Sequence, residues 1–427
     1  MPAVDVTPPP ALRAYGWAAD AIAPLLFRKI RRKLASEGVP PDRIRERLGH
    51  PTKDRPPGPL VWFHGASVGE TLSILPLIAP LRRARPDLTV LVTSGTAASA
   101  TVLAQRLPEG ALHQFAPIDS SAALARFHAH WRPDLLVLVE SEIWPQLLAS
   151  CTRRRVPVAL LNARLSARSL RRWQRFGRPA RWLLQRFSVI VTQTPDTTEA
   201  LRDLGAPYVR PGPNLKAAAP PAPDAPALRH ELAAAIGSRP VWLAASTHAG
   251  EEEIVLDAHT RLRQDHPEAL LLLAPRHLDR TQAIEALCRA RDLDLTRQSE
   301  GQAPAAAVHL VDTMGQLGTF YRLVPVTLIA GSFIPVGGHN PWEATCGTAL
   351  LHGPLVANCA TDYARLDTAG GSVEVTPETL APEIAALWSD PGRARRIGEA
   401  AMRAKAAQSD GTEGLARDLL TLMESPA

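Results

Sequence analysis

Residues 326–343 read VTLIAGSFIPVGGHNPWE, and this stretch decides the fold because it joins a buried strand to a helix start. The apolar run at 326–330 predicts a strand that is covered on both faces, as strands of parallel sheets are. Asn340 stands at an N-cap position, Pro341 at the first helical position and Glu343 three residues after the cap. These residue types at this spacing predict the N-terminus of a helix.

A strand, a glycine turn and a helix start in this order can form an anion site. Gly337 and Gly338 let the backbone turn sharply and approach a ligand closely. The first N–H groups of a helix have no partner within the helix, so they can point at that ligand. The residues alone leave a second interpretation open, because an ordinary capping box has the same pattern.

The same alternation of strands and helices runs through the whole chain. Helical patterns such as 72–83 and 122–131 separate short apolar runs that predict buried strands. These runs lie at 60–63, 88–92, 135–139, 156–161 and 189–191, and then at 241–244, 270–273, 308–311, 326–330 and 349–351. The pattern predicts an α/β protein with two parallel sheets, each covered by helices on both faces.

A chain of 427 residues is too long for one core. We expect an N-terminal membrane-associated segment at 1–50 and a first domain at 51–210. A Pro- and Ala-rich linker at 211–227 should precede a second domain at 228–427, which ends in a helix. Open α/β sheets bind ligands beyond the carboxyl ends of their strands, so we expect the site in an interdomain cleft.

Composition restricts the classes of partner. Lys and Arg outnumber Asp and Glu by 48 to 42, which favours anionic partners such as nucleotides, phospholipids or nucleic acid. Hydrophobic content of 45% with 21% charged residues is typical of a folded soluble protein. The four cysteines lie far apart without metal spacing, so we interpret them as reduced and structural: Cys151, Cys288, Cys346 and Cys359.

Two segments suit contact with an anionic membrane. The stretch 11–27 is moderately apolar and too polar for a span, and a basic cluster at 28–33 follows it directly. The alternative is a surface helix packed on the first domain. The arginine-rich stretch 164–186 could meet phosphorylated lipid, bind RNA or be a solvated helix. The N-terminus lacks the pattern of a cleavable signal.

Polar clusters follow the predicted strands, where ligand-binding loops belong. They lie at 64–70, 93–96, 140–145, 246–251 and 275–277. Glu70 joins a glycine loop to a helix, where it could act as a general base or only complement the helix dipole. Glu140 and Glu142 follow a strand end, so one could face a ligand while the other makes structural hydrogen bonds.

Two cationic residues are candidates for anionic ligands. Lys216 could reach a substrate carboxylate or be a solvated linker lysine, and Arg276 after a strand is a plausible phosphate ligand. Four histidines invite a metal site, but no two share a close ligand spacing, so we expect none: His64, His248, His277 and His339. A dinucleotide fingerprint of the G-x-G-x-x-G type is absent.

Seven motifs together resemble the 3-deoxy-D-manno-octulosonic acid (Kdo) transferases, glycosyltransferase family 30. They stand in the family's order at 64–70 (HGASVGE), 140–145 (ESEIWP), 162–169 (NARLSARS), 246–252 (STHAGEE), 274–277 (APRH), 312–317 (DTMGQL) and 331–344 (GSFIPVGGHNPWEA). The resemblance implies a GT-B fold with two Rossmann-like domains. It also implies transfer of Kdo from CMP-Kdo to a lipid A precursor, without a metal or other cofactor and without nucleic acid, at the cytoplasmic face of the inner membrane.

The resemblance also implies roles for individual residues. Glu70 matches the catalytic base of an inverting transfer, and Glu140 and Lys216 match positions that stabilise the transition state. The positions that match CMP contacts are Pro275, Arg276, Met314, Gly315, Gln316, Asn340, Pro341, Trp342 and Glu343.

The chain departs from the family pattern at three of these places. Gln316 replaces a usual Glu, Trp342 replaces a usual Leu, and the residues around Lys216 differ. The N-terminal segment is also less apolar than the usual anchor, which favours peripheral attachment. Two alternatives stay open: a nucleotide-sugar 2-epimerase on the same fold, and a protein that binds nucleotide or lipid without turnover.

Overall fold

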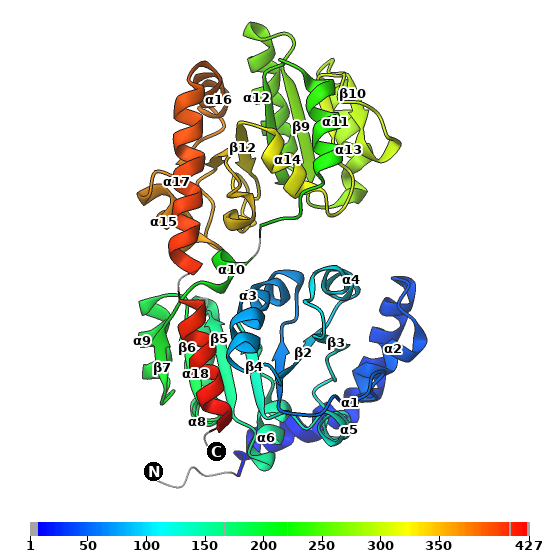
Figure 1. Ribbon diagram of the computed structural model, residues 1–427, viewed down its shortest axis with the longest axis vertical. Coiled ribbons are helices and arrows are strands. Elements are labelled where there is room, and N and C mark those ends of the chain that lie inside the picture. The colour runs from blue at the N-terminus through cyan, green and yellow to red at the C-terminus, as the bar shows by residue number, and fades with distance from the viewer. Residues whose placement is uncertain (1–6, 166, 220, 410, 425–427) are drawn as a thin grey trace. The chain divides into compact units, whose positions relative to one another are not determined.

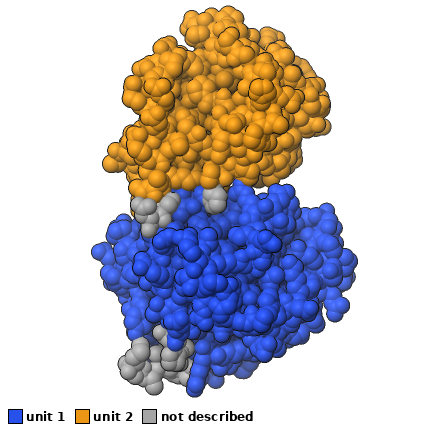
Figure 2. All heavy atoms as spheres, in the orientation of Figure 1, with its two compact units in different colours: residues 1–219, 408–427 blue, residues 220–407 orange. Residues whose placement is uncertain are grey.

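The computed structural model describes residues 7–165, 167–219, 221–409 and 411–424. The chain forms two compact units, coloured blue and orange in Figure 2. Unit 1 comprises residues 1–219 and 408–427, and unit 2 comprises residues 220–407. The first six residues of the predicted N-terminal segment and residue 166 of the motif at 162–169 lie outside the described residues.

Unit 1 is built on a parallel sheet of seven strands in the order β3-β2-β1-β4-β5-β6-β7 (Figure 1). Every residue of β1, β2, β4 and β5 is buried, as expected for strands covered on both faces. The strands are β1 Leu60–His64, β2 Thr89–Ser94, β3 Leu112–Phe115, β4 Leu135–Val139, β5 Val158–Ala163, β6 Val189–Thr192 and β7 Val209–Pro211. The prediction of a parallel α/β sheet is confirmed.

The helices of unit 1 include the last one of the chain. They are α1 Pro10–Ser36, α2 Pro41–Arg45, α3 Val68–Ala84, α4 Ala97–Arg106, α5 Ser121–Trp131, α6 Pro145–Arg154, α7 Ala167–Phe176, α8 Arg178–Leu184, α9 Pro195–Asp203, α10 Leu215–Ala218 and α18 Thr412–Glu424. We assigned the terminal helix to the second domain, and this was wrong. Leu415, Ala416 and Leu419 of α18 pack into the unit 1 core beside α3, because that core leaves an apolar face for them.

The predicted linker at 211–227 was also wrong in part. Its first half folds into α10, where the Asn214 side chain accepts a hydrogen bond from the N–H of Lys216 at 3.0 Å. Leu215 and Ala217 are buried, and α10 packs on α3. The first boundary between the units therefore falls between residues 219 and 220, and the second falls between residues 407 and 408. A polar cap and two apolar residues suffice for this helical turn despite the surrounding prolines.

Helix α1 lies on unit 1 rather than apart from it. Its Leu34 is buried in a small cluster with Ile44 and Phe115, and the Tyr15 hydroxyl donates to Asp119 at 3.1 Å. Within the described residues, no helix combines the length and the apolar character that a membrane span needs. The alternative of a helix packed on the first domain thus agrees with the structure.

Unit 2 repeats the plan with the strand order β10-β11-β9-β8-β12-β13-β14, again all parallel. The strands are β8 Val241–Thr247, β9 Leu270–Pro275, β10 Leu295–Arg297, β11 Val308–Leu310, β12 Val326–Ile329, β13 Ala349–His352 and β14 Ser372–Glu374. The helices are α11 Pro226–Ile236, α12 Glu251–Asp265, α13 Thr281–Arg289, α14 Leu317–Leu323, α15 Ala360–Thr368, α16 Leu380–Ser389 and α17 Pro391–Ser409. Its core lies between these helices and β8, β9 and β12.

Each sheet has one topological switch point, where successive strands stop being added on one side and are added on the other. In unit 1 this switch lies between β1 and β4, and in unit 2 between β8 and β12. Ligands of doubly wound sheets bind in the crevice outside the carboxyl ends of such strands. The loops that follow these four strands are therefore the first places to look for a site.

Candidate active site

Glu70 lies at the switch point of unit 1, in the first turn of α3. Its carboxylate accepts hydrogen bonds from the Ala66 N–H at 2.7 Å and from the Ser67 hydroxyl at 3.0 Å. The Ser67 side chain in turn caps the helix by accepting from the Glu70 N–H. Gly65 permits this close approach, since a Cβ there would lie 3.0 Å from the Cβ of Glu70. The loop therefore fixes the carboxylate through several bonds.

The surroundings of Glu70 favour its protonated form. Burial raises the pKa of Glu70 above its ordinary value, the Ala66 N–H opposes the rise, and the carboxylates of Glu140 and Glu142 add to it. A carboxylate with a raised pKa is a stronger base than an ordinary one. The hypothesis that Glu70 only complements the helix dipole does not account for three carboxylates gathered at one strand edge.

Glu140 and Lys216 meet in an ion pair at the same edge of the sheet. Glu140 directly follows β4 and has a φ of +61°, in the left-handed region that non-glycine residues rarely adopt. Lys216 is carried by α10, which packs on the helix that holds Glu70. Both side chains are largely buried, with 15% and 21% exposed. The structure thus brings together the three residues that we predicted as catalytic.

Glu142 makes a second, separate set of contacts. It pairs with His64 Nε2 at 3.4 Å and accepts from the Trp144 indole N–H at 2.6 Å. Burial alone would raise the pKa of Glu142, but the bonds from His64 and Trp144 outweigh it and lower that pKa. Of the two carboxylates after β4, Glu142 therefore makes the structural bonds and Glu140 pairs with lysine. The sequence left this division open.

An apolar cavity of about 570 Å³ opens beside these residues within unit 1. Its walls include His64, Ala66, Glu142 and Trp144. The Ala66 N–H donates the hydrogen bond that the Glu70 carboxylate accepts. The remaining wall is largely the apolar face of α1 with parts of the β3 and α5 loops: Ala18, Ala19, Ile22, Ala23, Leu26, Ile30, Ile118 and Leu124. Sequence reasoning missed this cavity, although the apolar residues of 11–27 were its signal.

In unit 2, Arg276 and His277 follow β9 and are exposed, and the Arg276 N–H donates to Thr247 O at 2.9 Å. Pro275 is the last residue of β9 and is buried. The predicted phosphate ligand is thus accessible at a strand end. Beside it the structure gathers three histidines that lie far apart in the sequence: His248, His277 and His339.

The backbone N–H groups of the loop after β12 bind a carboxylate of the protein itself, that of Glu251. The buried carboxylate of Glu251 accepts from the N–H groups of Gly331 at 2.6 Å, Ser332 at 2.8 Å and Phe333 at 2.9 Å. These three donors are therefore occupied, while the ligand site that we expect at Gly337, Gly338 and the turn at 340–343 stays a prediction. Glu251 starts α12, 80 residues earlier, so no local pattern could indicate the contact.

The helix start predicted at 340–343 is a 3₁₀ turn, Pro341–Ala344. Asn340 caps it by accepting from the Trp342 N–H at 3.2 Å. The side chains of Pro341 and Trp342 are buried, and Lys405 donates to the carbonyl of Trp342 at 2.9 Å. A contact between this turn and a bound nucleotide would thus come from its backbone, from Asn340 or from the half-buried Glu343.

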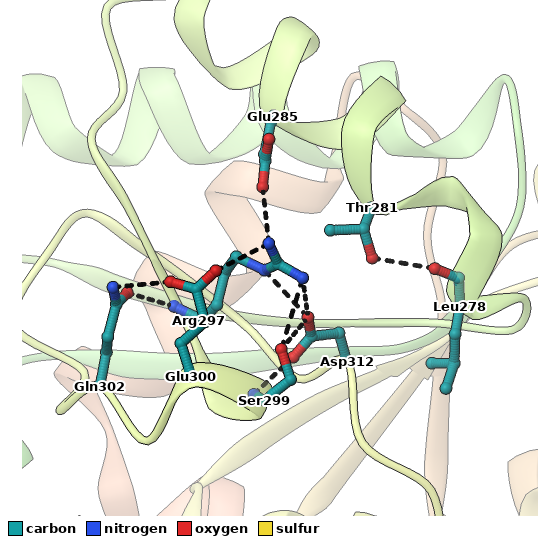
Figure 3. Close-up of polar contacts among 8 residues, drawn as sticks. All are labelled: Leu278, Thr281, Glu285, Arg297, Ser299, Glu300, Gln302 and Asp312. Carbon is teal, nitrogen blue, oxygen red and sulfur yellow. Dashed lines mark hydrogen bonds and ion pairs between the residues drawn. The ribbon is translucent and has the colours of Figure 1, made fainter.

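In the turn before α14, Met314 and Gly315 are exposed and Gln316 is half-buried, and the Gln316 side chain accepts from the Thr313 hydroxyl at 2.7 Å. Met314 has 72% of its surface exposed. Asp312, two residues earlier, is buried and accepts from Arg297 at 3.0 Å and from the Ser299 N–H at 2.8 Å (Figure 3). This cluster anchors the start of the turn.

The charge cluster around Arg297 explains the position of Asp312. Figure 3 shows the Arg297 guanidinium between Asp312, Glu300 and Glu285. Burial alone would raise the pKa of Asp312, but the bonds from Ser299 and Arg297 outweigh it and lower that pKa. Asp312 was part of a quoted motif, yet we assigned it no role, because its partner Arg297 belongs to a short edge strand.

Among the described residues, no group of three or more His, Cys, Asp or Glu side chains is arranged to hold a metal ion. The expectation of a metal-free site stays a prediction.

Comparison with known proteins identifies the family. Residues 42–219 match the family model described as 3-deoxy-D-manno-octulosonic-acid transferase (Kdo transferase). The Bordetella pertussis 3-deoxy-D-manno-octulosonic acid transferase is 35% identical over 377 residues, which cover 84% of this chain and 87% of that protein. A probable mitochondrial transferase of the same kind from Arabidopsis thaliana is 34% identical over 359 residues, 80% and 79% of the two chains.

A solved glycosyltransferase from Rickettsia africae shares the fold, with a TM-score of 0.60 at 11% identity over 86% of this chain and 99% of that one. The two parallel sheets, the seven ordered motifs and the sequence relatives agree. The chain therefore has the GT-B fold and belongs to the family of 3-deoxy-D-manno-octulosonic acid transferases.

Proposed function

We propose that this protein transfers Kdo from CMP-Kdo to a hydroxyl group of a lipid A precursor, with inversion and without a metal ion. The observation that carries the proposal is the position of Glu70, a base with a raised pKa that is hydrogen-bonded to the wall of an apolar cavity. Membership of the transferase family favours this reaction over the 2-epimerase alternative.

In the proposed reaction, Glu70 takes the proton of the acceptor hydroxyl while the hydroxyl oxygen attacks the anomeric carbon of Kdo. The bond from that carbon to the phosphate oxygen breaks, and its electron pair leaves with CMP. Lys216, held by Glu140, would balance negative charge on the Kdo carboxylate. Arg276 would meet the donor phosphate through its planar fork.

The acceptor side follows from the cavity in unit 1. Its volume of about 570 Å³ is in the range of small-molecule sites, which are mostly apolar with a few polar groups. The α1 wall suits the acyl part of a lipid, while His64, Glu142 and Trp144 offer polar contacts to its sugar. A sugar acceptor without a lipid part would leave the apolar wall of the cavity in contact with water.

Mass spectrometry of the product tests the proposal. The protein is incubated with CMP-Kdo and a tetra-acylated lipid A precursor in the presence of excess EDTA. We expect CMP release that depends on the lipid, with one or more Kdo residues added to it. This activity should persist in EDTA, because the described residues offer no metal ligand set. A loss of activity that Mg²⁺ restores would contradict the metal-free mechanism. Binding of both ligands without turnover would favour the non-catalytic alternative.

We also propose that unit 1 attaches to the cytoplasmic face of the inner membrane through α1 and the arginine-rich stretch. In α1, Trp17 and Leu25 have 75% and 69% of their surface exposed, next to the basic cluster at 28–33. In α7 and after it, exposed arginines lie before and after the exposed Phe176 in the sequence: Arg171, Arg172, Arg175, Arg178 and Arg181. Arg186 is excluded from this surface, since it is buried and lies 4.5 Å from the Trp182 ring.

We expect sedimentation with anionic liposomes at low salt and release at high salt. Each basic residue near such a surface contributes about 1 kcal/mol, and that contribution is screened by salt. Arg171→Ser with Arg175→Ser should weaken binding, while Arg395→Ser with Arg403→Ser, on exposed positions of α17, is the matched control. Binding that resists high salt would indicate insertion of α1, and no binding would remove the membrane role.

A further inference from the structure

Three histidines meet at the switch point of unit 2 without a role in the mechanism above. His248 follows β8, His277 follows β9 and His339 lies in the loop after β12, and these strands are neighbours in the sheet. The Nε2 atoms of His248 and His339 are 2.8 Å apart, and the ring centroids of His248 and His277 are 5.5 Å apart. Gly331 makes room, since a Cβ there would lie 2.8 Å from the His339 ring.

The contact between the two imidazoles requires one proton between their Nε2 atoms. His339 also hydrogen-bonds the backbone of Ser246, a bond that favours its protonated form, as a bond to a carbonyl oxygen does. In the neutral pair one Nε2 donates to the other, and the ring that donates keeps a bare Nδ1 that can take another proton.

The carboxylates of Glu251 and Glu252 favour the protonated form of His248, but each of them already has other partners. Glu251 is occupied by three backbone N–H groups, and Glu252 is occupied by Arg280. The groups that face His248 from the β9 loop are Arg276 and His277, both exposed. Burial lowers the pKa of His248, Glu251 and Glu252 oppose that shift, and His277 and Arg276 add to it. Burial lowers the pKa of His339 to about 4, with smaller contributions from His248, Arg276 and His277. An arriving anion would reverse this balance.

We propose that His248, His277 and His339 form a proton-accepting phosphate site beside Arg276, which takes up a proton from solvent when the nucleotide phosphate binds. This inference rests on the proposed function. The donor phosphate is a diester with one negative charge, and the released CMP is a monoester that gains a second charge near neutral pH. A site that gains a proton therefore favours the charge that develops as the bond to Kdo breaks.

Calorimetry of CMP binding to the full chain tests the inference. At pH 7.5, titrations in two buffers of different ionisation enthalpy give the number of protons taken up per CMP bound. We expect close to one for the wild type and close to zero for His248→Asn, with at least tenfold weaker CMP binding. Between pH 6.5 and 8 the wild-type affinity should fall by up to about tenfold per pH unit, because the bound state holds the extra proton.

Cytidine, which lacks the phosphate, should bind without proton uptake. His230→Asn changes an exposed histidine of α11 and should behave as wild type, whereas Arg276→Ala should weaken CMP binding yet keep the proton uptake. Intact CMP binding and Kdo transfer without proton uptake would overturn this inference and leave the proposed function standing. Wild-type protein that binds no CMP would overturn both.

Discussion

Replacing Glu70 with glutamine is expected to lower the rate of Kdo transfer about 10²- to 10⁴-fold, the range typical of a lost general base. Glutamine keeps the shape and can still accept from the Ala66 N–H, but it cannot take a proton from the acceptor hydroxyl. CMP affinity should stay unchanged, since Glu70 lies in unit 1 and the predicted nucleotide contacts in unit 2.

The pH dependence carries the sign of the raised pKa. Glu70 works as a base only when ionised, so the acid limb of the rate profile should lie above pH 4.5, its ordinary pKa. A raised pKa in the folded state means that the ionised carboxylate disfavours folding, so Glu70→Gln should not lower the melting temperature at pH 7.5.

Two outcomes would contradict this role of Glu70. Glu109→Gln, at an exposed loop position in the same unit, is the matched control and should keep full activity. A Glu70→Gln protein that retains half of the wild-type rate would exclude a general base. A protein that loses both activity and thermal stability would instead show that the capping contacts with Ser67 and Ala66 are what the residue supplies.

The sequence predicted the sheets well because buried parallel strands are runs of apolar residues. It missed the short strands β7, β10 and β14, and it missed β3, where His113 and Gln114 interrupt the apolar run. Both polar side chains are buried and have partners: His113 Nε2 lies 2.9 Å from the Ser94 hydroxyl, and Gln114 accepts from Trp131 at 2.8 Å. Tertiary partners of this kind make a polar residue acceptable in a strand, and no local pattern shows them.

The site was predictable to the extent that it lies at strand ends. Glu70 and Glu140 follow β1 and β4, and their gathering follows from the topology. The hydrogen bonds from the loop after β12 to Glu251 could not be predicted, since Glu251 lies in α12, far away in the sequence. The same holds for α18. Its apolar residues do not indicate in the sequence which core they join, and in the structure they pack on α3.

Lys216→Met is expected to lower the transfer rate about 10²- to 10³-fold, comparable to the loss of one preorganised group that stabilises charge. It should also lower stability, because it leaves the largely buried Glu140 without its partner. The double variant Glu140→Gln with Lys216→Met removes both charges, so it should regain much of the stability while staying inactive.

The separation of stability from rate decides what the pair does. Arg210→Met breaks an ion pair of the same unit with Asp418 that is exposed, so it should change neither quantity much. If the double variant regains stability and activity together, the pair only holds α10 against the β4 loop. If it is stable and inactive, the cation itself acts on the substrate. The left-handed backbone of Glu140 favours the second outcome, since strain of this kind gathers where a side chain must be aimed.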